Sequence, residues 1–205
     1  MIDLYLAGTA NGFRASVALE EAGLSYRVHK VDLAKGEHRG AEFLKLNPAG
    51  LIPVIVDQDG PGNRPLTLSQ SGAIILYIAE KTGKFLSKDA ARRAVAMQWF
   101  MQGATDVAAT SGAIFRLENS VPEKIPSSIE YFKQRLLGFF SVCDAQLAGR
   151  AYLADELSVA DLMLYPNFAL RKPLIDQAGG FENLQRWGAE MGARPGVQRG
   201  MQVLG

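Results

Sequence analysis

Two short stretches of the chain place hydrogen-bond donors where negative charges of a ligand can be met. In the first, Ser71 opens an apolar run that continues to Thr82 and stops at Gly83, which predicts a helix with a serine N-cap. The first turn of a helix has N–H groups without partners, and the helix dipole favours an anion there. A peptide carboxylate fits that position. Ser71 is therefore a candidate binding residue, and the alternative is a serine that only caps its helix.

The second stretch is Thr9-Ala10-Asn11-Gly12, which precedes a helix expected from Phe13 to Ala22. The hydroxyl of Thr9, the amide of Asn11 and the N–H groups of residues 11–13 are donors at the start of that helix. Donors that converge on one point stabilise an anion. Asn11 has a simpler alternative role as the N-cap of the helix, and the two roles can coexist.

A proline raises a third question, because it interrupts an apolar run. Leu51 to Val56 reads as a buried strand, yet Pro53 has no N–H to donate to a sheet. Proline is tolerated at the first residue of a strand or at an edge. We therefore expect regular pairing to begin at Pro53, which leaves the backbone of Ile52 just outside the ladder.

Composition excludes several classes of function. Lys and Arg total 22 against 21 Asp and Glu, a net charge of +1, so no basic field attracts nucleic acid. No leader pattern or membrane-length apolar run occurs, which gives a cytoplasmic location without a membrane partner as the expectation. The single cysteine, Cys143, excludes an internal disulfide or a cysteine-based metal site, and we expect no metal. A dinucleotide enzyme is excluded because no G-x-G-x-x-G follows the first strand.

The elements that must position these residues fall into two halves. Residues 1–82 mix strands and helices in the order βαβαββα, which gives a first domain. Its strands are expected at residues 2–6 and 26–33, parallel to each other, and in a hairpin of 53–56 with 66–68. A segment at 35–46 and the helix that begins at Ser71 complete the pattern.

Residues 89–205 form a second, all-helical domain with no convincing strand. Helices are expected at 89–118, 127–147, 158–171 and 181–192. The clearest local signal is a capping box of Ser158 and Asp161 with Leu157 and Leu162 as a hydrophobic staple. Its role is structural, because a capping box stabilises a helix start by about 1 kcal/mol.

This order of elements and several motifs resemble the cytosolic glutathione transferases over nearly the whole chain. Asn47-Pro48-Ala49-Gly50-Leu51-Ile52-Pro53 is similar to the family's N-P-x-G-x-[IV]-P strand, and Gln70-Ser71-Gly72-Ala73-Ile74 to its [EQ]-S-x-A-I helix start. Thr9 to Gly12 and Val31 to Glu37 resemble the Nu-class and Ure2-like subgroup, although Ala10 replaces the proline of its T-P-N-G turn. The resemblance implies a thioredoxin-like N-terminal domain followed by a helical bundle, with glutathione as co-substrate.

The resemblance also implies roles for the candidate residues. The Ile52–Pro53 bond is expected to be cis, with Ile52 paired to the cysteinyl backbone of glutathione. Ser71 then binds the γ-glutamyl carboxylate and Gln70 its ammonium, where many relatives have glutamate. Asn11, or else Thr9, stabilises the thiolate.

Other basic residues are candidates for the glycine carboxylate of glutathione. His38 is preferred by its place in the subgroup pattern, among Lys35, Arg39 and Lys45, and a solvated loop is the alternative for each. Arg14 is within reach of a ligand, although an exposed helix arginine is the commoner case.

Tyr5 is read as a packing residue, although some transferase classes use a tyrosine near this strand. Cys143 is expected to be buried. Since residues 1–82 contain no cysteine, both thiols of a disulfide reduction must come from glutathione.

The second substrate, a small hydrophobic electrophile or a disulfide, is expected against the helix at 89–118, and a homodimer is expected by analogy. Residues available to line that site are Trp99, Phe100, Met101, Phe115 and Arg116. The alternatives to a transferase are a glutathione-dependent disulfide oxidoreductase and a glutathione-binding protein without catalysis.

Overall fold

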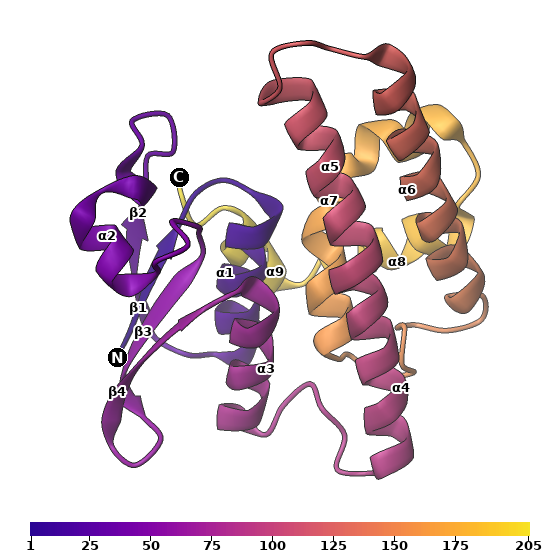
Figure 1. Ribbon diagram of the computed structural model, residues 1–205. Helices are drawn as coiled ribbons and strands as arrows, with labels where there is room; N and C mark the ends of the chain where they lie inside the picture. Colours follow the sequence, from indigo (N-terminus) through magenta and orange to yellow (C-terminus); the bar gives the residue numbers. More distant parts are fainter. The chain divides into compact units, whose positions relative to one another are not determined.

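The computed structural model describes all residues from Met1 to Gly205, and the chain folds into two compact units (Figure 1). The first unit contains Met1–Lys84 together with Gly192–Gly205, and the second contains Phe85–Met191. The sequence patterns carried no sign that the last segment returns to the first unit.

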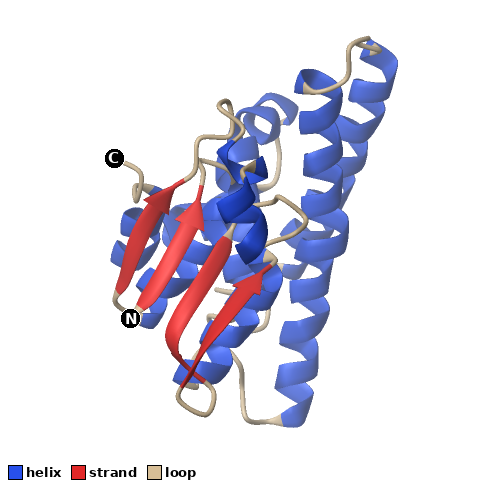
Figure 2. Ribbon diagram, turned by 60° about the vertical axis from the view of Figure 1, so that its left-hand side comes forward, coloured by secondary structure: helices blue, strands red, loops and turns tan.

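A four-stranded sheet forms the centre of the first unit (Figure 2). Its strands are β1 (Ile2–Leu6), β2 (Tyr26–Lys30), β3 (Val54–Gly60) and β4 (Arg64–Ser69), in the order β2-β1-β3-β4. β1 is parallel to β2 and antiparallel to β3, and β3 and β4 form the expected hairpin. The thioredoxin-like arrangement predicted from the sequence is confirmed. β2 ends three residues earlier than predicted, and the hairpin strands are longer than predicted.

Helices cover both faces of this sheet because β1 alternates its side chains between them. Leu4 and Leu6 are fully buried on one face, where α1 (Ala10–Ala22) and α3 (Ser71–Thr82) pack against each other and the sheet. On the other face Tyr5 meets Phe43, with the two ring centroids 6.4 Å apart. Phe43 belongs to α2 (Ala41–Leu46), which follows a short 3-10 helix, η1 (Glu37–Arg39). Tyr5 also stacks on His29, so its predicted role in packing is confirmed.

The chain's last helix, α9 (Pro195–Met201), packs against α1 within the first unit. The hydroxyl of Ser16 donates a hydrogen bond of 2.7 Å to the carbonyl of Gly200. Arg194 pairs with Glu21 at 2.6 Å, and Arg199 pairs with Glu20 at 2.7 Å. α9 was not predicted from the sequence, because its seven residues are too few for a periodic signal.

The second unit is all helical. The helix predicted at 89–118 is one helical run in which a π-helical segment, η2 (Gln102–Val107), joins α4 (Ala90–Met101) to α5 (Ala108–Asn119). It is followed by α6 (Pro126–Gln146), α7 (Val159–Ala178) and α8 (Glu182–Gly192). α7 extends seven residues past the predicted end at Arg171, although it contains Pro166 and Pro173. No helix of the structure is long and apolar enough to cross a membrane.

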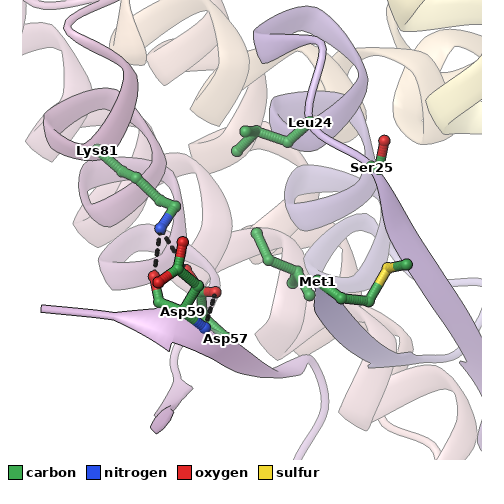
Figure 3. Close-up of a pocket in the computed structure, with 7 residues that line it drawn as sticks. Met1, Leu24, Ser25, Asp57, Asp59 and Lys81 are labelled. Atoms are coloured by element: carbon green, nitrogen blue, oxygen red, sulfur yellow. Dashed lines mark hydrogen bonds and ion pairs between the residues drawn. The ribbon is translucent and has the colours of Figure 1, made fainter. Parts of the chain in front are cut away.

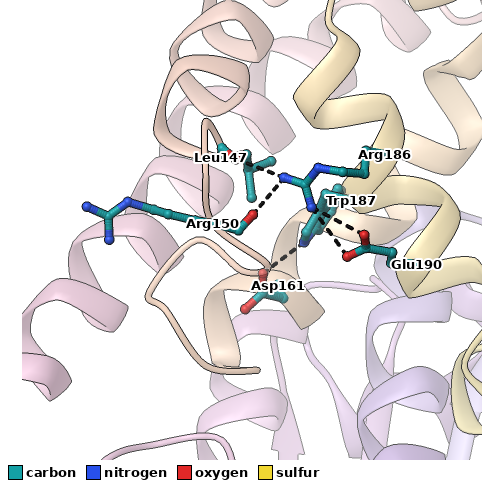
Figure 4. Close-up of polar contacts among 6 residues, drawn as sticks. All are labelled: Leu147, Arg150, Asp161, Arg186, Trp187 and Glu190. Atoms are coloured by element: carbon teal, nitrogen blue, oxygen red, sulfur yellow. Dashed lines mark hydrogen bonds and ion pairs between the residues drawn. The ribbon is translucent and has the colours of Figure 1, made fainter.

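The predicted capping box at the start of α7 is confirmed and reaches further than a local cap. Asp161 is fully buried and accepts hydrogen bonds from both the N–H and the hydroxyl of Ser158, each at 3.0 Å. It also accepts a bond of 3.0 Å from the indole N–H of Trp187 on α8 (Figure 4). Arg186, the neighbour of Trp187, donates to the carbonyls of Leu147 and Arg150. One buried carboxylate therefore joins α7 to α8.

Candidate functional site

The turn after β1 is shaped by Thr9 and Gly12. Thr9 is the N-cap of α1, and its side-chain oxygen accepts a 3.1 Å hydrogen bond from the N–H of Gly12. A Cβ at position 12 would lie 2.2 Å from the carbonyl oxygen of Ala7, so only glycine fits. α1 begins at Ala10, three residues before its predicted start, and Asn11 lies exposed in its first turn. The alternative role of Asn11 as N-cap is therefore wrong.

The start of α3 differs by one residue from the prediction. Gln70 holds the N-cap position, and Ser71 is the first helical residue, so Ser71 is not the N-cap. Gln70 has φ 71° and ψ 112°, a conformation that residues other than glycine rarely adopt. Such backbone strain persists where the surroundings hold it, and it is found often at ligand sites. Ser71 is buried at the base of this turn.

Arg14 joins these two turns. Its guanidinium donates to the side-chain oxygen Oδ1 of Asn11 and, over 3.4 Å, to the hydroxyl oxygen of Ser71. The residue is only 1% exposed, and burial lowers the pKa of its side chain to about 10, which leaves it charged at neutral pH. The expectation of an exposed helix arginine is therefore wrong. The contact between Arg14 and Asn11 was predictable from their spacing, because residues three apart are neighbours on one face of a helix.

The segment before β3 presents the backbone of Ile52. β3 begins at Val54, one residue after the predicted start at Pro53, and Ile52 lies outside the strand pairing as predicted. The Ile52–Pro53 peptide bond is cis, as the resemblance implied. The amide of Asn47 donates a 2.7 Å bond to the carbonyl of Leu51, which fixes the chain just before Ile52. The side chain of Ile52 packs on Phe43 and its neighbours, so its backbone is held firmly.

His38 lies in η1, close to the same segment. A Cβ built on Gly50 would lie 3.1 Å from the carbonyl oxygen of His38. The 3-10 helix η1 therefore lies next to Gly50, two residues before Ile52. His38 is half-buried, and its Nδ1 is buried without a hydrogen-bond partner. Two of its basic neighbours already have acidic partners: Lys35 pairs with Asp32 at 3.4 Å and Lys45 with Glu42 at 2.6 Å. No interaction in the structure joins His38 directly to Asn11 or Ser71.

A pocket of about 300 Å³ lies at the other end of the sheet and contains none of the predicted site residues (Figure 3). It is lined by Met1, Ile2, Leu24, Ser25, Asp57, Asp59 and Lys81. Met1 and Ile2 begin β1, whereas Thr9 and Asn11 follow its last residue. Within the pocket, Lys81 bonds to the Asp57 carboxylate at 3.0 Å and to the Asp59 carbonyl at 2.6 Å.

The helical unit contains the other candidates. Cys143 is buried, as expected, and burial, with the nearby Asp144, raises the pKa of its thiol to about 12. It is therefore not a nucleophile at neutral pH. Of the residues suggested for a second substrate, Phe100 is core, whereas Met101 and Phe115 are 47% and 57% exposed.

Comparison with known proteins agrees with this geometry. The family profile described as glutathione S-transferase, N-terminal domain, matches residues 10–81. The disulfide-bond oxidoreductase YfcG of Escherichia coli (strain K12) is 37% identical over 198 residues, which cover 95% of this chain and 92% of YfcG. The chain belongs to the glutathione transferase family. The recognised resemblance is thereby confirmed.

Solved structures of other glutathione transferases share the whole fold. One from Pseudomonas putida, with one glutathione disulfide bound per subunit, has a TM-score of 0.89 and 33% identity, and the match covers 100% of this chain and 92% of that one. The transferase URE2P6 from Phanerochaete chrysosporium, in complex with oxidized glutathione, has a TM-score of 0.89 and 28% identity, with 98% and 95% covered. The likeness to Ure2-like members is therefore confirmed as well.

Proposed function

We propose that this glutathione transferase binds reduced glutathione and uses its thiolate to attack electrophiles or to reduce disulfides. One observation carries the proposal: Arg14 contacts both Asn11 and Ser71, which links the donors at the starts of α1 and α3. Donors at two such points suit a ligand with two separate negative groups. The glutathione held by related structures supports the same ligand class.

Each part of the tripeptide has a proposed partner. Ser71 donates to the γ-glutamyl carboxylate, Gln70 hydrogen-bonds the ammonium, and the backbone of Ile52, positioned by Pro53, pairs with the cysteinyl residue. His38, a half-buried residue of η1, binds the glycine carboxylate. These assignments use groups whose positions are set by the fold.

Asn11 is the proposed thiolate donor on the resemblance to the T-P-N-G subgroup, and Thr9 is the alternative, because its hydroxyl accepts the N–H of Gly12 and keeps its own hydrogen to donate. An ordinary thiol has a pKa of about 8.5 and is mostly protonated at neutral pH. Lowering that pKa by two units requires about 2.7 kcal/mol of preferential binding of the anion. The amide of Asn11 and the free N–H groups of the first turn of α1 supply part of it.

Disulfide reduction is the second candidate activity, and the similarity to the oxidoreductase YfcG favours it. The bound thiolate attacks one sulfur of the substrate disulfide, forms a mixed disulfide with glutathione and releases the other half as a thiolate. A second glutathione thiolate then attacks the mixed disulfide, which yields glutathione disulfide and the second reduced thiol. Cys143 takes no part because it is buried and protonated.

The finer assignments extend the proposal. The helical unit supplies the binding surface for the second substrate, and the active protein is a homodimer. It acts in the cytoplasm, where glutathione keeps thiols reduced.

The test combines binding with two turnover assays. We expect retention on glutathione-agarose, and turnover of a chloronitrobenzene electrophile or of hydroxyethyl disulfide. Asn11→Ala should lower kcat more than it raises KM for glutathione, and Ser71→Ala should do the reverse. Cys143→Ala is the control and should leave disulfide turnover unchanged. Binding without turnover in both assays would identify a non-catalytic glutathione-binding protein, and absence of binding would refute the proposal.

A further inference from the structure

Resting on the proposed function, we infer that Arg14 is a positioning residue that sets the direction of hydrogen bonding at Asn11 and Ser71, so that both present donors to bound glutathione. Neither its contact with Asn11 nor that with Ser71 involves the ligand. The proposal therefore concerns how the site is prepared before glutathione arrives.

A guanidinium has only donors, so the atom of Asn11 that faces Arg14 must be its carbonyl oxygen Oδ1. Rotation of the amide by half a turn would place its NH2 group against the N–H groups of Arg14, donor against donor. Arg14 therefore holds the NH2 group of Asn11 turned away from itself. An NH2 group can donate to a thiolate, whereas a carbonyl oxygen would repel it.

The same reasoning applies to Ser71. Its hydroxyl oxygen accepts from Arg14 at 3.4 Å, a long contact that uses one lone pair. The single hydrogen of that hydroxyl then points to another acceptor. At the first helical residue of α3 this suits a carboxylate, because the helix N–H groups face the same anion.

The burial of Arg14 strengthens its effect on the orientation of Asn11 and Ser71. Arg14 is 1% exposed, so its donors cannot turn to bulk water, and Nη1 makes both contacts with Asn11 and Ser71. Because the guanidinium is fixed, Asn11 and Ser71, which belong to different helices, must both accept a hydrogen bond on the side that faces it. A purely structural role would also require the contacts, but it would not depend on which side of the Asn11 amide faces the ligand.

Asn11→Asp separates the two roles. The introduced carboxylate keeps an oxygen toward Arg14, so the protein folds, but it has no NH2 group to donate. We expect kcat to fall at least about tenfold, and the pKa of the bound glutathione thiol, read from the pH dependence of thiolate ultraviolet absorbance, to rise by about one unit or more. An unchanged thiol pKa would overturn the inference.

Variants of Arg14 itself give the second arm. Arg14→Met should raise both the thiol pKa and KM for glutathione, and Arg14→Lys, which keeps donors only, should restore part of both. Arg171→Met is a matched control, since Arg171 lies in the helical unit and donates to Ser111 at 2.9 Å. It should lower thermal stability without moving the thiol pKa. Equal effects of Arg14→Met and Arg14→Lys on the thiol pKa would contradict the inference.

A ligand-free measurement keeps this inference separate from the proposed function. Because the side chain of residue 11 contacts Arg14, the carboxylate introduced by Asn11→Asp gains an ion pair. Its Tm, relative to the parent protein, should therefore rise at neutral pH, and this rise should be lost as the pH falls below about 4. The rise should vanish in the double variant Asn11→Asp/Arg14→Met. Absence of the rise refutes the contact with Arg14 on which the orientation of Asn11 depends, even if glutathione binds, whereas failure of glutathione binding with the rise intact refutes only the proposed function.

Discussion

Gln70 has a positive backbone φ of 71° at the N-cap of α3. Its side chain carries no charge. The proposed partner of that side chain is the ammonium group of glutathione. A neutral amide offers a hydrogen bond, whereas a carboxylate adds the attraction between opposite charges.

Gln70→Glu should therefore strengthen glutathione binding by about 1 to 2 kcal/mol, roughly a tenfold lower Kd by calorimetry. The control ligand is a glutathione analogue that lacks the γ-glutamyl amino group, for which no gain is expected. An equal gain for both ligands would show that Gln70 does not contact the ammonium.

Gly12 is a second residue at which a substitution should alter the candidate site, because an added side chain has no room there. Gly12→Ala places a methyl group 2.2 Å from the carbonyl oxygen of Ala7, so the turn that carries Thr9 and Asn11 must move. We expect a loss of at least about 2 kcal/mol of stability in urea denaturation. Gly138→Ala in α6, where nothing lies within 4 Å of the new methyl, should instead gain about 0.5 to 1 kcal/mol. Similar effects at both positions would argue against the close contact at Ala7.

Among the secondary-structure elements of the first unit, α3 is joined to the sheet by Asp57. This buried residue of β3 accepts 2.6 Å and 3.0 Å contacts from Tyr77 and Lys81, both on α3. Burial alone would raise the pKa of Asp57, but the hydrogen bonds from Tyr77, Lys81 and the N–H of Asp59 outweigh it and hold the pKa below its ordinary value. The helix that begins with Ser71 is thus anchored near its other end.

This anchor should depend on pH in a defined direction. Because the pKa of Asp57 is lower in the folded chain than the ordinary 3.8, its stabilisation is complete above that value and is lost as the pH falls below it. We expect Asp57→Asn to cost about 2 kcal/mol at neutral pH and progressively less below about pH 4, measured by urea denaturation.

Asp176→Asn is the control for this prediction. Asp176 is an exposed partner of Lys172 on the same helix, at 2.6 Å. Its replacement should cost little at any pH, because exposed ion pairs contribute weakly. A cost of Asp57→Asn that stays constant down to acid pH would show that its carboxylate is not the anchor.

At the scale of the whole molecule, the chain's end completes its first unit. α9 lies so close to α1 that a Cβ on Gly200 would be 2.6 Å from the Cα of Val17. α1 in turn carries Asn11 and Arg14, so the helix that builds the site is held from behind by the last residues of the chain.

Gly200→Val should therefore displace α9 and destabilise the first unit by at least about 2 kcal/mol. Hydrogen exchange read by mass spectrometry should rise in α1 and α9 and stay unchanged in α4 to α7. Gln198→Ala, an exposed change on the same helix, should leave exchange in α1 unchanged. Unchanged exchange in α1 after Gly200→Val would mean that α9 does not support α1.

The order of strands and helices, the strand start near Pro53 and the capping box at Ser158 were predictable from the sequence. These are local properties, since they depend on residue spacing, on proline's missing N–H and on short side chains that bond to their own backbone. The motifs around Pro53 and Ser71 also sufficed to recognise the family.

The contacts of Arg14 and the packing of α9 on α1 were visible only in the three-dimensional structure. Arg14 lies on α1, whose sequence has no feature that marks this arginine as buried. Its contact with Ser71 joins residues that are 57 positions apart in the sequence. α9 is similarly short and weakly patterned, and its place follows from glycine at position 200 and from Glu20 and Glu21 far away in the chain. Local periodicity reports which face of a helix is apolar, but not which distant segment covers it, because that depends on packing between elements that are remote in sequence.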